Sequence, residues 1–279
     1  MVGSEFAIVR RRVVEEADKL RLAGFDVSNR KLCTIIVILL AISELFSIWR
    51  PEVGIISHAI VGISTAVMAA FLKDNSPIRK LLISILPIPL VRIVSISAPI
   101  IQFTMVQWFL MMGALLFSSL VISIIVIGDP IERYGFRLPK RGTRHIEAII
   151  ILSGLGLGFI EFQILEVDAI SLDTSPVKLL APLSAIYLGT GLLEELLFRG
   201  VIQRHAIDTL GSSAGILLTT LIFMIMHTGW QSFADIIFVG IVGAIFSLVV
   251  LRTGSLLGVS ISHALVNLSL FIITPVHFG

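Results

Sequence analysis

Nine mostly apolar stretches divide the chain, and they limit its possible folds more than any other feature. They cover residues 32–49, 53–72, 81–98, 105–128, 146–165, 177–199, 212–229, 234–251 and 255–273. An α-helix needs about 17–25 such residues to cross the hydrocarbon core of a bilayer. The third stretch is the weakest, because Pro87, Pro89 and Arg92 should kink it or make it partly re-entrant. The sequence therefore predicts an all-α, polytopic membrane protein with eight to nine transmembrane helices.

Composition supports this class. Hydrophobic residues make up 56% of the 279 residues, charged residues only 14%, and the mean hydropathy is +1.01. Soluble proteins carry about 25% charged residues, and a water-soluble fold of this size could not bury so much apolar surface. The single cysteine, Cys33, excludes an internal disulfide and a CxxC metal or redox motif. We expect the lipid bilayer as a partner, and no nucleic acid.

The Lys and Arg residues predict the orientation, because these residues collect in cytosolic loops. If the N-terminus is cytosolic, the segments on that side hold 17 of the 21 Lys and Arg residues, and the C-terminus then lies outside. Residues 7–31 are basic, with apolar residues at helical spacing, which favours an amphipathic helix on the anionic inner leaflet. Nothing marks a second domain, so we expect one integral membrane domain over residues 1–279.

Three fragments place ionisable side chains inside the apolar stretches of the last third of the chain. They are Glu194-Glu195-x-x-x-Arg199, Phe223-x-x-x-His227 and His263-x-x-x-Asn267. An ionisable group within a span is costly and marks a functional site by default. Residues four apart lie on one helix face, so each helix offers one stacked pair.

Counting along the helices predicts that these pairs share one depth. The stretches 177–199 and 212–229 form a hairpin that turns near Gly211, with Glu195 16 residues before it and His227 16 residues after it. Antiparallel helices of equal rise bring such residues to a similar height. His263 lies 10 residues past Thr253 on a helix that starts on the same side. We therefore expect an intramembrane catalytic cavity in the cytosolic part of the bilayer.

The residue types suit the activation of water. A carboxylate in an apolar pocket can act as a general base, and a neighbouring imidazole can orient the water. A second imidazole and an amide can donate to the oxyanion that forms when water adds to a carbonyl. Arg199 would fix one of the two carboxylates. These parts suffice to hydrolyse an amide without serine, cysteine or metal, although the spacing leaves open whether Glu194 or Glu195 is the base.

The three motifs, in this order, resemble those of the CAAX protease and bacteriocin-processing family of intramembrane proteases, which includes the type II CAAX prenyl endopeptidases. The resemblance covers residues 146–273 and extends to Gly240-Ile-Val-Gly243 and Thr253-Gly-Ser255. It implies eight spans, one fewer than the count above. It also implies a prenylated protein substrate, cut after its modified cysteine with release of three residues.

The resemblance also implies a role for each motif residue. Glu194 would activate water together with His227. His263 and Asn267 would stabilise the oxyanion, while Glu195 and Arg199 would position the site. The catalytic residues are thus predicted to be Glu194, Glu195, Arg199, His227, His263 and Asn267.

Two alternatives remain open at this point. Zinc accepts the ligand types of Glu194, His227 and His263, but no HExxH pair occurs and the two imidazoles are 36 residues apart. We therefore expect no metal cofactor, with a zinc-dependent protease as the alternative. The other alternative is a non-catalytic membrane protein, either a transporter or a bacteriocin-immunity factor, because buried acids and imidazoles also serve proton relays. The absence of visible inverted repeats argues against a transporter.

Three further charges lie well inside the predicted spans, away from their ends. Glu44, Arg92 and Glu161 all fall toward the outer leaflet by the topology above. Isolated charges there would be costly unless closely paired. We expect a structural ion cluster in which Arg92 pairs with one or both acids. The remaining histidines belong to no motif and are predicted to be structural or interfacial: His58, His145, His205 and His277.

Overall fold

The computed structural model describes residues 28–99, 102–168 and 182–278, and every regular element within those ranges is helical. The first part of the chain forms α2 (Asn29–Trp49), α3 (Pro51–Phe71), α4 (Pro77–Ile85), α5 (Pro87–Ser97), α6 (Met105–Ile127) and the 3-10 turn η2 (Ile131–Tyr134). The second part forms α7 (Arg144–Leu165), η3 (Ala185–Leu192), α9 (Leu193–Glu195), η4 (Leu196–Ile202), α10 (Gln203–Leu210), α11 (Ser212–Met226), η5 (Thr228–Trp230), α12 (Phe233–Thr253), α13 (Leu257–Leu268), η6 (Ser269–Ile273) and α14 (Thr274–Phe278).

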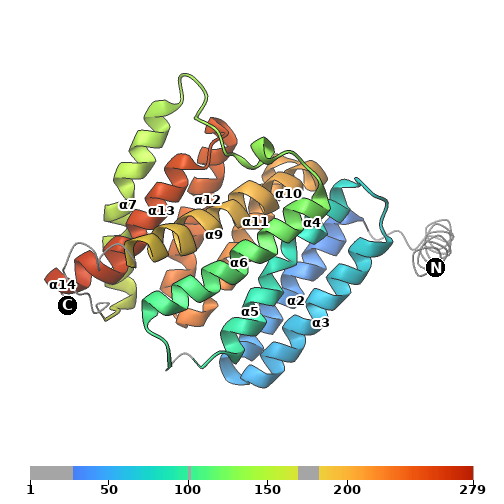
Figure 1. The fold of residues 1–279 in the computed structure, drawn as a ribbon, viewed down its shortest axis with the longest axis horizontal. Coiled ribbons are helices and arrows are strands. Elements are labelled where there is room, and N and C mark those ends of the chain that lie inside the picture. Colours follow the sequence, from blue (N-terminus) through green and yellow to red (C-terminus); the bar gives the residue numbers. More distant parts are fainter. Residues whose placement is uncertain (1–27, 100–101, 169–181, 279) are drawn as a thin grey trace.

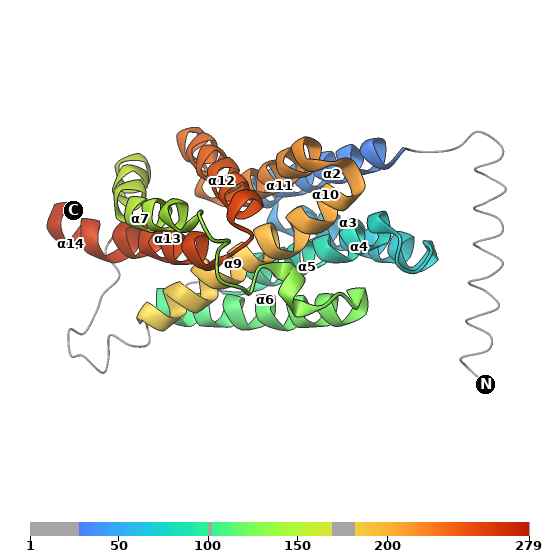
Figure 2. The same cartoon turned by 90° about the horizontal axis from the view of Figure 1, so that it is seen from above.

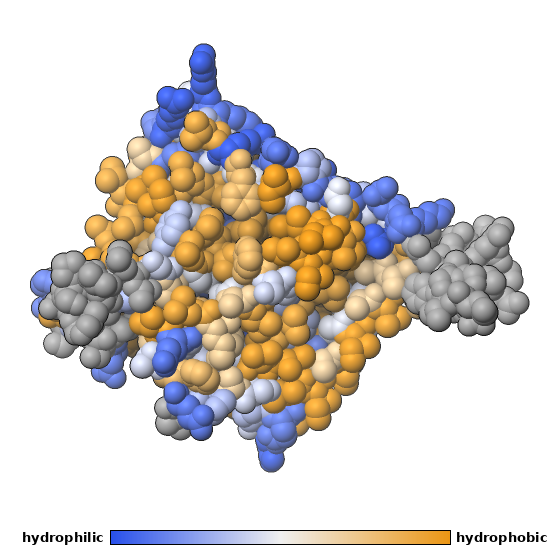
Figure 3. Space-filling view, viewed as in Figure 1, coloured by the Kyte–Doolittle hydropathy of each residue, from blue (hydrophilic) through white to orange (hydrophobic). Residues whose placement is uncertain are grey.

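Eight helices among the described residues are long and apolar enough to cross a membrane. They are Asn29–Trp49, Pro51–Phe71, Pro77–Ser97, Met105–Ile127, Arg144–Leu165, Ser212–Trp230, Phe233–Thr253 and Leu257–His277. The prediction of an all-α polytopic protein with eight to nine spans is thus confirmed. An apolar surface lies between hydrophilic regions at the upper and lower ends of the molecule in Figure 3. The amphipathic helix predicted for residues 7–31 falls almost wholly outside the described residues, since α2 begins at Asn29.

The stretch predicted as the sixth span, residues 177–199, is not among these eight helices. Its described part belongs to a helical rod over residues 182–210 in which the π-helical segments η3 and η4 flank the short helix α9. Seen from above, this rod lies between α6 on one side and α12 and α13 on the other (Figure 2). π-Helical turns change the direction of side chains and occur frequently at functional sites.

Local sequence explains where several helices begin and end. Pro87 starts α5 directly after Leu86, so the third span is broken there, as its prolines predicted. Thr104 and Gln107 form a capping box at the start of α6. α12 ends at Gly254, whose φ of 73° is a left-handed conformation that glycine adopts without strain.

The loops predicted to be cytosolic gather at one end of the molecule. The Lys80 ammonium is 2.5 Å from Asp129 after α6, and Arg133 pairs with Asp208 on α10. Arg137 donates to the carbonyl of Gly254 at 2.8 Å, which joins the α6–α7 connection to the end of α12 (Figure 1). These connections fix the relative height of the helices that carry the three motifs.

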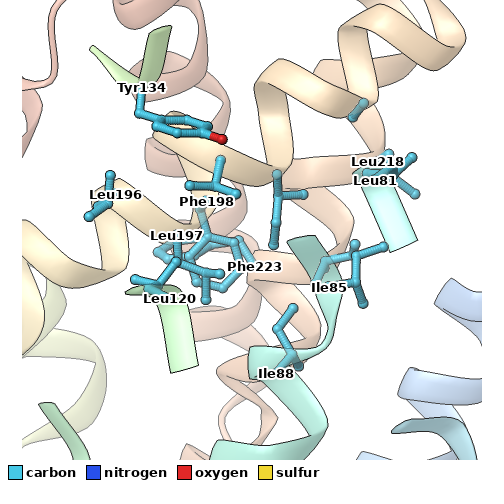
Figure 4. Close-up of a cluster of buried hydrophobic side chains, with 14 of the residues drawn as sticks. Leu81, Ile85, Ile88, Leu120, Tyr134, Leu196, Leu197, Phe198, Leu218 and Phe223 are labelled. Atoms are coloured by element: carbon cyan, nitrogen blue, oxygen red, sulfur yellow. The ribbon is translucent and has the colours of Figure 1, made fainter. Parts of the chain in front are cut away.

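One hydrophobic core runs through both parts of the chain, from Cys33 in α2 to Val259 in α13. Around the site it is formed by Leu197 and Phe198 of η4 with Phe223 of α11, shown in Figure 4. Cys33 is only 3% exposed and packs within this core.

Close packing between α7 and α13 depends on glycine. A Cβ on Gly154 would lie 2.6 Å from the Ser262 carbonyl oxygen, and one on Gly158 would meet the Val266 carbonyl. Small residues allow transmembrane backbones to approach this closely. This packing holds the helix that carries His263 and Asn267 against α7.

We predict that Gly154→Ala lowers the thermal unfolding temperature of the protein in detergent, whereas Gly156→Ala leaves it unchanged or slightly raises it. Both glycines lie in α7, but a Cβ on Gly156 would meet nothing within 4 Å. Overpacking a tight contact costs about 1–3 kcal/mol. Equal effects of the two substitutions would contradict the proposed contact.

Candidate active site

A buried ion pair forms the centre of the site. Arg199 on η4 and Glu195 on α9 are both 0% exposed, and the Arg199 Nη1 group donates to Glu195 Oε1 at 2.8 Å. The same Oε1 atom accepts a hydrogen bond from His263 Nδ1 on α13, also at 2.8 Å. A buried charge is tolerated only when it is closely paired. Glu195 therefore holds both the Arg199 guanidinium and the His263 ring in place.

The Arg199 guanidinium is held on its other sides by two more helices. Its Nη2 donates to the carbonyl of Gly243 on α12 at 3.2 Å. Its Cζ lies 4.3 Å from the ring centroid of Phe223 on α11, a cation–π contact. A Cβ on Gly243 would lie 2.9 Å from Nη2, so a glycine is needed at this position.

The two adjacent glutamates have different surroundings. The Glu194 side chain is 27% exposed, whereas that of Glu195 is 0% exposed. Glu194 lines a cavity, and its Oε2 lies 3.9 Å from Nε2 of His263. The His263 ring thus has Glu195 at one nitrogen and Glu194 near the other. Glu194 is the carboxylate that faces open space.

His227 lies where α11 ends. Its Nδ1 is 2.8 Å from the Phe223 carbonyl oxygen. A carbonyl only accepts, so Nδ1 carries the hydrogen in this contact, and Nε2 remains for another partner. The His227 and Phe223 rings are 4.5 Å apart, and His227 lines the same cavity as Glu194.

Asn267 lies one turn after His263 and is oriented by a hydroxyl. Its Nδ2 donates to Thr190 Oγ1 at 2.8 Å, and Thr190 in turn donates to the Ile186 carbonyl at 2.6 Å. An amide nitrogen has two hydrogens, so a second one is left for a ligand. Sequence reasoning missed Thr190, since a hydroxyl in a helix gives no signal.

Two cavities meet at these residues. One of about 120 Å³ is lined by Glu194, His227, His263 and Asn267 together with aromatic side chains. A second, of about 300 Å³, extends toward α5 and α6. Five residues line both cavities: Phe109, Thr190, Glu194, His227 and Trp230.

The structure therefore brings all six predicted site residues together on three separate parts of the chain, around one cavity. Glu194, His227, His263 and Asn267 line that cavity, while Glu195 and Arg199 lie behind it. Their catalytic roles stay predictions.

The ion cluster predicted near the outer leaflet forms with only one of the two acids. Arg92 donates from Nε and Nη2 to the two Glu44 oxygens, each at 2.5 Å, and His58 Nε2 is 3.0 Å from Glu44 Oε1. Glu161 was wrongly grouped with this cluster. It lies on α7 and lines the same cavity as Glu194.

The described residues do not fit a zinc site with several protein ligands. Among them, no group of three or more His, Cys, Asp or Glu side chains could hold a metal ion. Structural and catalytic zinc sites use at least three such ligands. Independence of metal itself stays a prediction.

A family comparison agrees with the motifs. Residues 176–269 match the family model described as type II CAAX prenyl endopeptidase Rce1-like. All three motifs fall within this segment, so the resemblance drawn from them is confirmed there. No curated protein and no solved structure matches the chain.

We predict that Arg199→Met destabilises the protein by about 3–5 kcal/mol, because it leaves the Glu195 carboxylate buried with an incomplete set of partners. Replacing both residues in Arg199→Met/Glu195→Met should recover part of the loss. Chemical unfolding in detergent micelles would measure both values. Additive effects of the Arg199 and Glu195 substitutions would show that the pair is not coupled.

Proposed function

We propose that this protein is an intramembrane endopeptidase in which Glu194 activates water to hydrolyse a peptide bond of a membrane-anchored substrate. The family match supports a CAAX-type intramembrane protease, without specifying its substrate or mechanism. One observation carries the finer proposal. Glu194 lines a cavity with two imidazoles and an amide, while its neighbour Glu195 is buried behind the cavity, where its Oε1 holds Arg199 and His263.

The reaction begins with a water molecule between Glu194 and His227. Glu194 removes one proton as the water oxygen attacks the scissile carbonyl carbon. Nε2 of His227 accepts a hydrogen bond from the other O–H of the water and so orients it. The resulting oxyanion receives hydrogen bonds from the second Nδ2 hydrogen of Asn267 and from His263. A ring held between two carboxylates can carry a second proton, and His263 then donates from Nε2.

Collapse of the tetrahedral intermediate completes the reaction. Glu194 passes its proton to the leaving nitrogen, and the C–N bond breaks to give a carboxylic acid and an amine. The carboxylate of Glu194 is thereby restored. The acid then loses its remaining proton to the amine, which leaves a new carboxylate and a new ammonium group. No step requires a metal or a covalent intermediate.

The family match and the position of the cavity support the proposed substrate class. Aromatic and aliphatic side chains on membrane-spanning helices surround the site, so a substrate reaches it from the lipid. A prenylated protein with a CAAX-type C-terminus meets this requirement. The positively charged loops gathered at one end favour a cytosolic N-terminus and a site that opens toward the cytosol.

We expect Glu194→Gln to lower kcat by about 10²–10⁴-fold, the usual contribution of a general base, with no change in thermal stability. Mass spectrometry of a farnesylated CAAX peptide incubated with the purified protein would measure cleavage and identify the cut bond.

The matched control is Glu52→Gln, which replaces an exposed glutamate in the first turn of α3 and should leave activity unchanged. A thorough chelation control should also leave it unchanged. Full activity of the Glu194→Gln protein would rule out the mechanism.

Thr190→Val should reduce kcat/KM by about tenfold, the equivalent of one hydrogen bond of about 1.4 kcal/mol, because Asn267 loses the hydroxyl that orients it. Thr190→Ser keeps the hydroxyl and should retain most of the activity in the same peptide assay. If valine and serine behaved alike, the hydroxyl would have no part in positioning Asn267.

A further inference from the structure

We propose that Arg92 binds the C-terminal carboxylate of the substrate, in the larger of the two cavities that meet at Glu194. This inference rests on the proposed function, because it assigns a place to the short peptide released by cleavage. It makes Arg92 a specificity-determining residue outside the three motifs.

The larger cavity connects Arg92 with the reacting groups. Arg92 and Ser95, three residues apart on α5, line it together with Glu194 and His227. Its remaining walls are mainly apolar and include Trp108, Phe109, Met112 and Met226. A short apolar peptide that ends in an anion matches a cavity of this composition.

The Arg92 guanidinium has hydrogen-bonding capacity left. Its side chain is 22% exposed, and Glu44 takes up one N–H of Nε and one of Nη2. Nη1 makes only a 3.3 Å contact with Ser95. A guanidinium has five N–H donors, which suit a carboxylate in particular. Donors therefore remain for a carboxylate in the cavity.

The charge around Arg92 also permits a second carboxylate. Glu44 is 0% exposed and faces both the Arg92 guanidinium and the imidazole of His58, whose Nε2 is 3.0 Å from Glu44 Oε1. Glu44 thus has a second partner, so its carboxylate does not depend on the Arg92 guanidinium alone.

The smaller cavity does not offer such a place. Its lining residues include Glu161 as well as Glu194, and no Lys or Arg lies among those that the structure describes there. Glu161 is 6% exposed and adds a second carboxyl group, not a cation, to this lining. The two cavities therefore differ in charge, and the anionic end of a substrate is directed toward Arg92.

The test compares binding of the free tripeptide valyl-isoleucyl-methionine with binding of its C-terminal carboxamide to the full chain in detergent. Fluorescence of Trp108 and Trp230, which line the cavity, would follow binding, and calorimetry would confirm it. We expect the acid to bind at least about tenfold more tightly than the amide, a difference of about 1.4 kcal/mol. The preference should vanish in Arg92→Gln.

Two matched variants separate recognition from folding. Glu44→Gln keeps the cation and should keep or increase the preference for the acid. The double variant Glu44→Gln/Arg92→Gln leaves no unpaired carboxylate and should fold, yet bind acid and amide equally. A purely structural role of Arg92 would weaken both peptides alike and leave their ratio unchanged.

Equal binding of acid and amide by the unaltered protein, no binding of the acid, or a preference that survives in the double variant would overturn the inference. Its failure is distinguishable from that of the proposed function. Cleavage of a farnesylated peptide and of its C-terminal carboxamide at equal rates would refute only the role of Arg92. Preferential binding of the acid without cleavage of any membrane-anchored peptide would refute only the protease.

Discussion

The burial of the Arg199 guanidinium is the constraint on which the rest of the structure depends. A cation with no exposed surface inside a membrane protein needs partners on every side. Here they come from Glu195 beside it, the Gly243 carbonyl on α12 and the Phe223 ring on α11, while Glu195 also holds His263 on α13. The three motif-bearing parts of the chain and α12 together bury this charge, so the contacts that bury it also bring the three motifs together.

This arrangement explains why two glutamates stand next to each other. Neighbouring residues on a helix point about 100° apart. The two glutamate side chains therefore lie in different surroundings. Glu195 points toward Arg199 and His263 and has no exposed surface. Glu194 points into the cavity with only His263 near it, at 3.9 Å. Glu194 therefore has fewer fixed partners than Glu195, which is why we propose it as the carboxylate that exchanges a proton.

Helix geometry made much of this predictable, since rise and periodicity are nearly constant. Equal distances from Gly211 predicted that Glu195 and His227 lie at a similar height, and the break at Pro87 followed from proline. Counting residues along a helix gives the height of a side chain but not the side of the helix on which it lies. For this reason Glu161 was grouped with Arg92 and Glu44, although it lines the cavity beside Glu194. Thr190 is uncharged, so nothing in the sequence marked it as a residue of the site. The π-helical segments around α9 have no sequence signature that distinguishes them from an ordinary span.

The Arg92–Glu44 pair lies close to the turn that follows His227. Glu44, which pairs with Arg92, has its Oε2 3.4 Å from Thr228 Oγ1, and Thr228 donates its hydroxyl hydrogen to the Ile225 carbonyl at 2.9 Å. Thr228 directly follows His227 and begins the turn that ends α11. In the proposed complex the peptide carboxylate binds Arg92 beside Glu44, and Glu44 lies close to Thr228, the residue that follows His227. The proposed recognition of the substrate's end and the proposed orientation of the attacking water therefore take place on neighbouring residues.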